Sequence, residues 1–372
     1  MRSRFKSYLL HEALGFAGHM AFLPFGILLF YQLFRSSIEH TALLYMMIFA
    51  LQALSNLTVP FISSYIKIKH LYYAGIGLMI VSSLLLTLPL TQNVLNIWIL
   101  LYGVGRGFYF LPKVFFIGEI TDEHTLGHAT AQLMNVTNIT RAIGPAIGGY
   151  ISWKFGMPGL ALYVAVCHAT SLIFIRSIPN VNLDFGELKK TYKLKRTDRE
   201  TLLSGLDSFF VVLNAFIWPL VTYLVLKKAS LNEIGLLLAA SVLIRIVVTS
   251  KVGTFLDATK NKLRFVHVGS VVYAMGWLLR AAIFNVTSYL LFNGIFQIIN
   301  AGYRTSVATL DFILISKKVS SSHFHSLVVI REFYRNIVAL MPFALTVILF
   351  PLFGPKSILI IAGIAALLYE RL

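Results

Sequence analysis

The chain has 372 residues, of which 57% are hydrophobic and 13% carry a charged side chain. Soluble domains average about 25% charged residues, so this composition excludes an ordinary soluble enzyme. The net charge of +17 would suit a nucleic-acid partner, but the basic residues lie in short gaps between apolar runs. We therefore expect no nucleic-acid binding, and the apolar runs predict an all-α polytopic membrane protein.

A helix needs about 20 mostly apolar residues to cross a bilayer, and twelve such stretches follow one another along the chain. Basic residues precede the first stretch, as in a signal peptide, but no small-residue cleavage site follows it, so we expect a retained helix. Arginine and glutamate interrupt the tenth and eleventh stretches. The twelve predicted spans are residues 8–34, 41–66, 71–90, 94–118, 127–152, 157–178, 201–226, 231–256, 264–284, 287–315, 323–350 and 355–370.

Lysine and arginine concentrate in the cytoplasmic loops of membrane proteins. With the N-terminus inside, the cytoplasmic segments carry nineteen of these residues and the opposite side carries five. We therefore expect a protein of the cytoplasmic (inner) membrane with both termini in the cytoplasm. The basic gap at 180–200 is predicted to link two six-helix bundles, residues 1–179 and 201–372. Contact with anionic lipids is the alternative role of this gap.

Three motifs lie in or between the spans. The fifth span has a glycine–proline motif that lets neighbouring helix backbones approach closely in a membrane. We predict that this motif packs helices together; its residues are Gly144, Pro145, Gly148 and Gly149. A second motif, between the eighth and ninth spans, contains Gly253, Asp257 and Lys260. The third motif is an arginine close to a glycine, and it occurs twice, at Arg106 in the fourth span and at Arg304 in the tenth. Because each is the fourth span of a set of six, the pair suggests an internal repeat.

The twelve spans, their division into two sets of six and these motifs resemble the major facilitator superfamily. The resemblance implies two pseudo-symmetric six-helix bundles that rock around a central site, with no enzymatic activity. It also implies that Gly253, Asp257 and Lys260 latch the cytoplasmic gate. The first-half counterpart of this motif, near residues 60–70, keeps basic residues but lacks the glycine and the aspartate, so we expect asymmetric gating. The fifth-helix motif is most prominent in exporters and favours export.

Basic residues exceed acidic residues within the predicted spans, which favours an anionic or amphipathic solute. The resemblance places Arg106 and Arg304 on helices that line the cavity, and two guanidinium groups suit a carboxylate or a phosphate. Support of the bundle is the alternative role of Arg106. We also predict substrate contact for Asn135 and Asn214, although Asn135 could equally hydrogen-bond between helices. The basic residues in the spans are Arg106, Lys113, Arg141, Arg245, Arg280, Arg304, Arg331 and Arg335.

Acidic groups in the spans are candidates for proton coupling and for gating. Asp207 in the seventh span and Glu12 in the first are predicted to carry the coupled proton. Their alternative role is an ion pair that closes the cytoplasmic end. A charged cluster crosses spans ten and eleven, and we predict a salt-bridge network at the gate. Its members are Asp311, Arg331, Glu332 and Arg335.

Other chemistries lack a pattern in the sequence. The pair Glu12 and His19 is too sparse for a metal site, no nucleotide-binding loop is present, and the single cysteine permits no intrachain disulfide. We predict a monomeric antiporter for the efflux of a small solute in exchange for protons, without cofactor or metal. The alternatives are an importer or facilitator of a sugar-like or organic-acid solute, a non-transporting membrane sensor and a polytopic membrane enzyme.

Overall fold

A computed structural model describes residues 2–120, 126–177, 199–227, 229–258, 262–303 and 324–371. This part of the chain is almost entirely helical, which confirms the predicted all-α class, and each of the twelve predicted spans contains helix. Seven helices of the described residues are long and apolar enough to cross a membrane. Three residues of the predicted site, Lys260, Arg304 and Asp311, lie outside the described residues.

The first half begins with four helices that correspond to the first four predicted spans. They are α1 (Arg2–Leu33), α2 (Ile38–Ser63), α3 (Ile68–Leu85) and α4 (Gln92–Ile120). The next helix, α5 (Leu126–Ser171), covers both the fifth and the sixth predicted spans, and the 3-10 turn η1 (Leu172–Ser177) follows it. Gly156 lies between the two predicted spans with a φ of 63°, a conformation that glycine adopts without steric cost. The two spans are therefore joined by a kink without an intervening loop.

The second half contains several helices that are interrupted by irregular turns. The seventh predicted span consists of α7 (Arg199–Val212), the π-helical turn η2 (Leu213–Ile217) and α8 (Trp218–Val225). The tenth begins with the short helix α11 (Val286–Ser288) and the π-helical turn η3 (Tyr289–Asn293), and residues 294–303 continue it. The other helices are α9 (Leu231–Ala258), α10 (Lys262–Ala281), α13 (Phe324–Val338), α14 (Met341–Phe353) and α15 (Ser357–Arg371).

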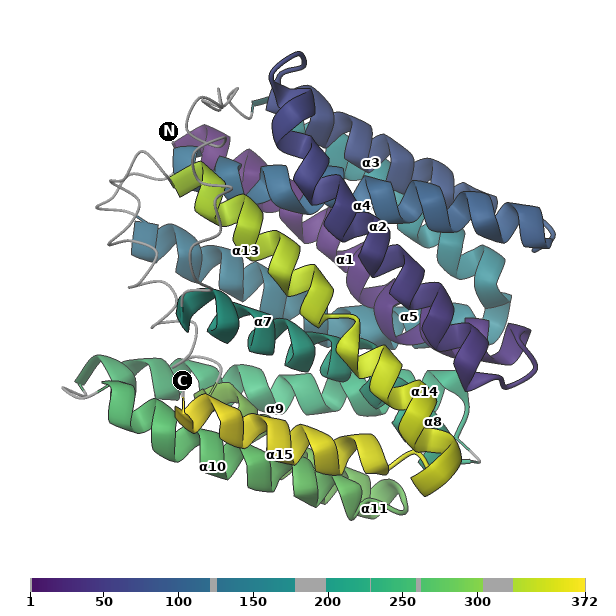
Figure 1. Cartoon of the computed structure of the whole chain (residues 1–372), viewed down its shortest axis with the longest axis vertical. Helices are drawn as coiled ribbons and strands as arrows, with labels where there is room; N and C mark the ends of the chain where they lie inside the picture. Colours follow the sequence, from purple (N-terminus) through teal and green to yellow (C-terminus); the bar gives the residue numbers. More distant parts are fainter. Residues whose placement is uncertain are drawn as a thin grey trace.

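The helices lie side by side, and both chain termini lie at the same end of the molecule (Figure 1). At the opposite end the connections are short, and polar side chains cap the helices that follow them. Ser37 accepts a hydrogen bond from the backbone N–H of His40 at 3.2 Å at the start of α2. At the start of α9, the N–H of Glu233 donates to Ser230 and the Glu233 carboxylate accepts from the N–H of Ser230. These caps satisfy N–H groups that a helix start leaves unpaired.

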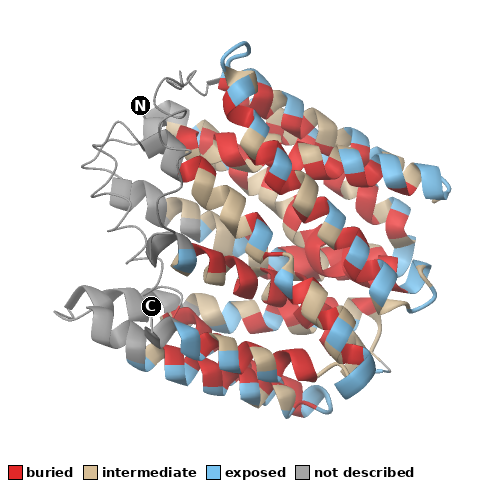
Figure 2. Ribbon diagram, viewed as in Figure 1, coloured by how far each residue is buried: buried red, intermediate tan, exposed pale blue. Residues whose placement is uncertain are grey.

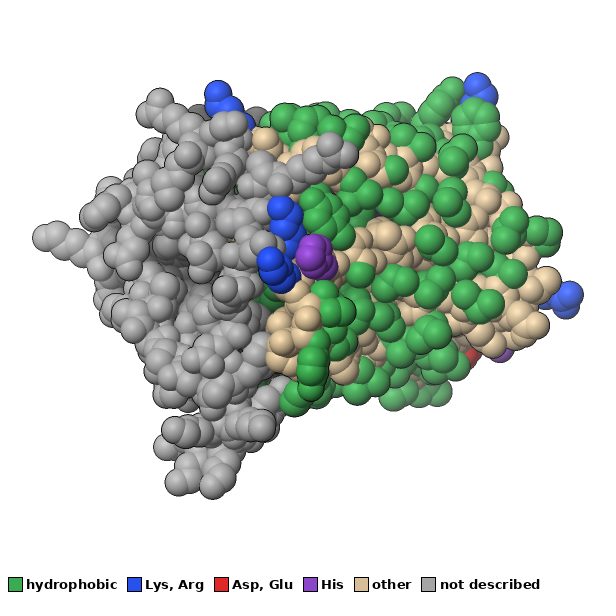
Figure 3. Space-filling view, turned by 90° about the horizontal axis from the view of Figure 1, so that it is seen from above, with side chains coloured by type: hydrophobic (Ala, Val, Ile, Leu, Met, Phe, Trp, Pro, Cys, Tyr) green, Lys and Arg blue, Asp and Glu red, His purple; other side chains and the backbone are tan. Residues whose placement is uncertain are grey.

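Apolar side chains cover much of the outer surface of the described residues, while a separate set of buried side chains fills the space between the helices (Figure 2). Figure 3 shows hydrophobic side chains across one outer face, with the few lysines and arginines at its margins. Exposed apolar surface of this extent marks an interaction with a partner or a membrane. Together with the spanning helices, it defines a multi-pass membrane protein.

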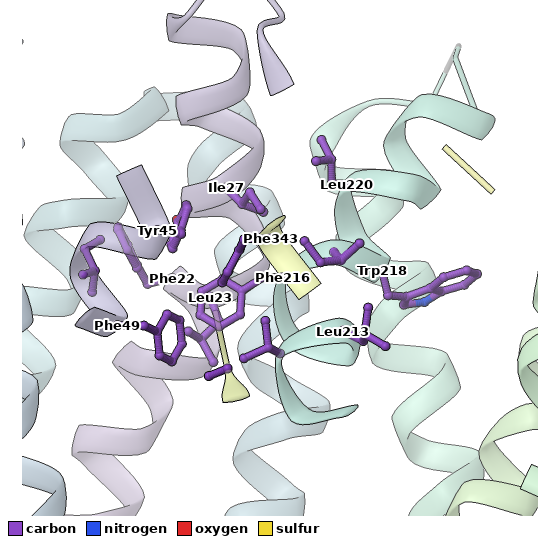
Figure 4. Close-up of a cluster of buried hydrophobic side chains, with 14 of the residues drawn as sticks. Phe22, Leu23, Ile27, Tyr45, Phe49, Leu213, Phe216, Trp218, Leu220 and Phe343 are labelled. Carbon is purple, nitrogen blue, oxygen red and sulfur yellow. The ribbon is translucent and has the colours of Figure 1, made fainter. Parts of the chain in front are cut away.

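The two halves contact each other through a small set of helices. Helix α5 packs along α9, α2 packs against α13 and α14, and α1 contacts η2 and α8. Figure 4 shows the aromatic part of this contact, where Phe216 and Phe343 of the second half lie against Tyr45 and Phe49 of α2. The rings of Tyr45 and Phe343 are stacked with centroids 5.6 Å apart. The two halves therefore pack against each other through helices and aromatic side chains of both.

Candidate functional site: a cationic cavity between the halves

A cavity of about 150 Å³ lies between the two halves. Helices α1 and α5 form its wall on the first half, and the wall on the second half comes from α7, η2, α8, α9, α10 and residues 297–300. None of the described residues that line it is acidic, and three are arginines. The polar residues of the lining are Arg141, Asn214, Arg245, Arg280, Gln297 and Asn300.

Arg280 of α10 is the most completely buried of these arginines, with 1% of its surface exposed. Its Nη1 donates to Asn214 Oδ1 at 2.7 Å, and its Nε donates to Asn293 Oδ1 at 2.8 Å. Nη2 is buried and has no hydrogen-bond partner among the described residues. The side chain is thus held by neutral amides, and part of its hydrogen-bonding capacity is unused.

Aromatic rings surround the same guanidinium group. Its central carbon lies 3.5 Å from the ring centroid of Phe296, 4.1 Å from that of Trp218 and 4.9 Å from that of Trp277. Contacts of a cation with aromatic faces are attractive, by about 2 kcal/mol or more where water is excluded. The rings therefore stabilise the charged guanidinium group where water is excluded, but they do not supply an opposite charge.

The two asparagines that bind Arg280 both belong to π-helical turns. Asn214 lies in η2 and donates its amide to the carbonyl of Phe210 at 2.9 Å. Asn293 lies in η3 and donates to Ser241 Oγ at 2.7 Å. These second contacts fix which amide atoms face Arg280, because each amide nitrogen is already in use and each oxygen is free to accept.

The remainder of the cavity wall is largely apolar and comes from both halves. Met20, Leu23 and Pro24 lie on α1, and Leu238 and Val242 lie on α9. A ligand in this space would contact both halves at once. The arrangement is suited to a small molecule that carries negative charge at one end and has an apolar body.

The predicted substrate residues are not brought together. Asn214 lines the cavity, but Arg106 is absent from the lining, and Asn135 on α5 is exposed. Arg106 Nε donates to Gln52 Oε1 at 2.7 Å, and the guanidinium lies between aromatic rings of the first half. These contacts fit the bundle-supporting role that was the alternative for Arg106.

The predicted coupling residues lie on opposite halves and outside the cavity lining. Glu12 is 3% exposed and its carboxylate forms an ion pair with Lys113 of α4. Next to it, His11 shares a hydrogen bond of 2.7 Å with Tyr72 Oη. Asp207 is partly buried on α7. The ion pair of Glu12 thus lies within the first half.

The described gating candidates lie on α13 and on α9. Arg335 and Glu332 form the ion pair expected for residues three apart on a helix, with atoms 2.9 Å apart. Arg331 Nε donates to Ser204 Oγ of α7 at 2.8 Å. Gly253 and Asp257 are part of α9.

The glycine–proline motif of α5 faces two helices. A Cβ atom at Gly144 would lie 2.6 Å from the Cβ of Met20, and one at Gly148 would lie 2.4 Å from the carbonyl oxygen of Ala21. A Cβ at Gly149 would lie 2.9 Å from the Cα of Gly235 on α9. Pro145 lines the cavity between these contacts. The small residues therefore allow α5 to approach α1 in its own half and α9 in the other half.

Sequence reasoning counted Arg141, Arg245 and Arg280 among the basic residues of the spans but did not select them as site residues. Arg280 lies in the ninth predicted span, which the family resemblance does not place around the cavity. The sequence did contain a signal for Arg280. An arginine in a membrane span needs polar partners, and no acidic residue occurs between 264 and 303 that could serve as a nearby counter-charge. Its partners come from positions 66 residues before it and 13 after it, and only the fold brings them together.

The comparisons agree with a transporter architecture. The family model for the Major Facilitator Superfamily matches residues 12–341. The chain therefore belongs to this superfamily, whose members carry small solutes across membranes. No curated protein sequence matches the chain.

Solved structures of transporters share the fold. A D-xylose–proton symporter is 12% identical with a TM-score of 0.76, and the match covers 99% of this chain and 96% of that one. A POT family transporter in complex with 5-aminolevulinic acid is 13% identical with a TM-score of 0.75, covering 99% and 94%. The human organic anion transporter MFSD10 (TETRAN) is 12% identical with a TM-score of 0.70, covering 100% and 98%. At these identities the likeness concerns the fold alone.

Proposed function

We propose that this protein is a secondary active transporter that exports a small anionic or amphipathic solute in exchange for protons. The observation that carries the proposal is the cavity between the halves, which is lined by three arginines and by no acidic residue among those described. Arg280 is the most completely buried of the three, and its described hydrogen-bond partners are neutral amides. A buried cation is costly unless an opposite charge compensates it, and a bound anion would supply that charge and leave with the transport cycle.

The cavity also supports a small solute and an alternating-access mechanism. Its volume of about 150 Å³ is below the roughly 300–1,000 Å³ typical of sites for drug-sized ligands. Because its walls come from both halves, movement of one half against the other would open the site to one side of the membrane at a time.

Export and proton coupling are further parts of this proposal. Export is favoured by the glycine–proline motif, which in this chain lies between α1 and α9. We assign proton coupling to Asp207 or Glu12, since each is a carboxylate at membrane depth and outside the anion cavity. A carboxylate in such a place changes its charge when it takes up a proton, and that change alters its pairing within the protein.

The test is transport by the purified protein in liposomes. Butanesulfonate is a suitable anion, because it stays ionised and does not cross the bilayer as a neutral acid; butanesulfonamide is its uncharged analogue. We expect accumulation of labelled butanesulfonate when the lumen is acidic, above the level of protein-free liposomes, and no such excess for the sulfonamide.

Other outcomes select the alternatives. Accumulation of butanesulfonate only when the exterior is acidic would contradict the proposed export and would indicate an importer. Equal protein-dependent movement of the sulfonamide, or movement of sugars alone, would contradict an anionic substrate. Absence of any protein-dependent movement would contradict transport of this class of solute.

A further inference from the structure

We propose that Arg280 binds the carboxylate group of a small organic acid and that Asn214 and Asn293 position it for this contact. The substrate class would be a monocarboxylate with an apolar body. This inference rests on the proposed function and deepens it, because it assigns the anion to one arginine of the three and names the chemical group. It introduces Arg280 and Asn293 as specificity-determining residues.

The hydrogen bonds of Arg280 are the first argument. The guanidinium group has five N–H donors, and the described partners, Asn214 and Asn293, accept from Nη1 and Nε only. Nη2 is buried and without a partner. An unused donor on a buried cation costs free energy, so a ligand that accepts from Nη2 would be bound strongly there.

The charge of Arg280 is the second argument. Both described hydrogen-bond partners are neutral amides, and no carboxylate of the described residues forms an ion pair with it. The ion pairs elsewhere show that this chain does supply partners to other cations, as Glu12 does for Lys113. A counter-charge for Arg280 would have to come with the ligand.

The aromatic rings restrict where a ligand group can approach Arg280. Phe296 and Trp218 lie within 3.5 Å and 4.1 Å of the central carbon of Arg280, so they occupy the space beside its planar group. Nη2 is the donor without a partner on a residue that lines the cavity, so a ligand would bind at this edge. A carboxylate is planar and accepts hydrogen bonds from a guanidinium edge with good geometry. The apolar body would then lie against Met20 and Leu23, which line the same cavity.

The π-helical turns are an independent observation. Asn214 belongs to η2 and Asn293 to η3, in two different helices of the second half, and both amides converge on Arg280. π-helical turns are rare and frequently occur at functional sites. Here two such turns hold the two asparagines that bind Arg280, which indicates that the fold forms a binding site at this arginine. Asn293 is additionally held by Ser241 at 2.7 Å, so its orientation is fixed before any substrate arrives.

The experiment measures binding to the full chain in detergent. Straight-chain monocarboxylates from acetate to hexanoate are compared with their neutral amides by thermal unfolding, because a ligand of the folded state raises the unfolding temperature. For the wild-type protein we expect at least tenfold tighter binding of the best carboxylate than of its amide.

Two substitutions test the assignment. Arg280→Lys keeps the charge but loses the planar group, and should weaken carboxylate binding at least tenfold while the weak binding of the amide is unchanged. Asn293→Asp has the same shape but places a carboxylate of the protein beside Nε. This carboxylate should compete with the ligand and weaken carboxylate binding by a similar factor, without loss of stability. If Arg280→Lys does not fold, Asn293→Asp decides alone. The matched control is Lys154→Gln, which removes an exposed cation outside the cavity.

The outcomes separate this inference from the proposed function. A wild-type protein that binds carboxylates and amides equally would overturn the anionic substrate and with it this inference. A wild-type preference for carboxylates that survives in every folded variant would overturn only the role of Arg280. Loss of the preference in Lys154→Gln as well would indicate a non-specific charge effect and would also overturn it.

Discussion

At the residue scale, the buried charges have partners of different kinds. Glu12 and Lys113 compensate each other across α1 and α4, and Arg106 is held by the neutral amide of Gln52 and by aromatic rings. Arg280 is likewise held by neutral amides and aromatic rings, but unlike Arg106 it lines the cavity between the halves. Its position in the cavity wall, and not the kind of its protein partners, is what distinguishes Arg280 from Arg106.

The ion pair of Glu12 and Lys113 gives a prediction for stability. Glu12→Gln should leave Lys113 as a partly buried uncompensated cation and cost up to about 3–5 kcal/mol of folding free energy, the range for breaking a fully buried pair. The double variant Glu12→Gln/Lys113→Met should recover much of this loss, since it removes both charges. Thermal unfolding in detergent measures the three variants against wild type, and a double variant less stable than Glu12→Gln would contradict the role of the pair.

The coupling hypothesis gives a prediction for transport. Asp207→Asn keeps the shape of the side chain but cannot ionise, so it should abolish accumulation of butanesulfonate against its gradient. Exchange of labelled for unlabelled anion should continue, because exchange needs no net proton movement. Glu12→Gln in the same assay tests the alternative residue. Normal accumulation by Asp207→Asn would remove Asp207 as the coupling site.

At the element scale, close approach of α5 to its neighbours depends on small residues. Gly148 lies against the backbone of Ala21 on α1, and Gly149 lies against Gly235 on α9. The glycines thus set the spacing both within the first half and between the halves. Helices in membranes associate through such packing because the lipid supplies no hydrophobic driving force between them.

A glycine substitution in α5 tests this packing. Gly148→Ala would place a Cβ 2.4 Å from the carbonyl oxygen of Ala21, so we expect a loss of about 1–3 kcal/mol, as for other overpacked sites. The matched control is Gly77→Ala in α3, where a Cβ would have no neighbour within 4 Å. That change should be neutral or slightly stabilising, because alanine favours a helix by up to about 1 kcal/mol over glycine. Equal unfolding temperatures for the two variants would contradict the packing role.

At the scale of the whole molecule, one of the contacts between the halves lies at the end away from the chain termini. Phe216 and Phe343 pack on Tyr45 and Phe49 (Figure 4), and the Nε2 of Gln32 donates to Tyr223 Oη at 3.0 Å. Gln32 is at the end of α1 and Tyr223 is in α8. These contacts join the two halves at this end, and the proposed alternating access would require them to separate.

Cross-linking the two halves tests that movement. In a Cys167→Ser background, Gln32→Cys/Tyr223→Cys joined by a short bismaleimide should lose transport of butanesulfonate, because the halves can no longer part. The two single-cysteine variants treated with the same reagent should retain it. Full transport by a protein that mass spectrometry shows to be cross-linked would contradict opening at this end.

The sequence by itself determined the class of the protein. Long apolar stretches can satisfy their backbone hydrogen bonds in lipid only as helices, so the all-α membrane fold followed from hydropathy, and the motifs identified the superfamily. Local signals located the close-packing glycines of α5 and the pair of Glu332 and Arg335, because these depend on neighbours in sequence.

The tertiary structure decided which polar residues share a site. Spacing and family resemblance selected Arg106, but the fold buries it against Gln52 and leaves Arg280 in the cavity. The partners of Arg280 are presented by two π-helical turns, and neither turn nor their convergence has a local sequence pattern. Contacts between residues far apart in the chain depend on how whole helices pack, and for this reason the fold was predictable while the arrangement of residues around Arg280 was not.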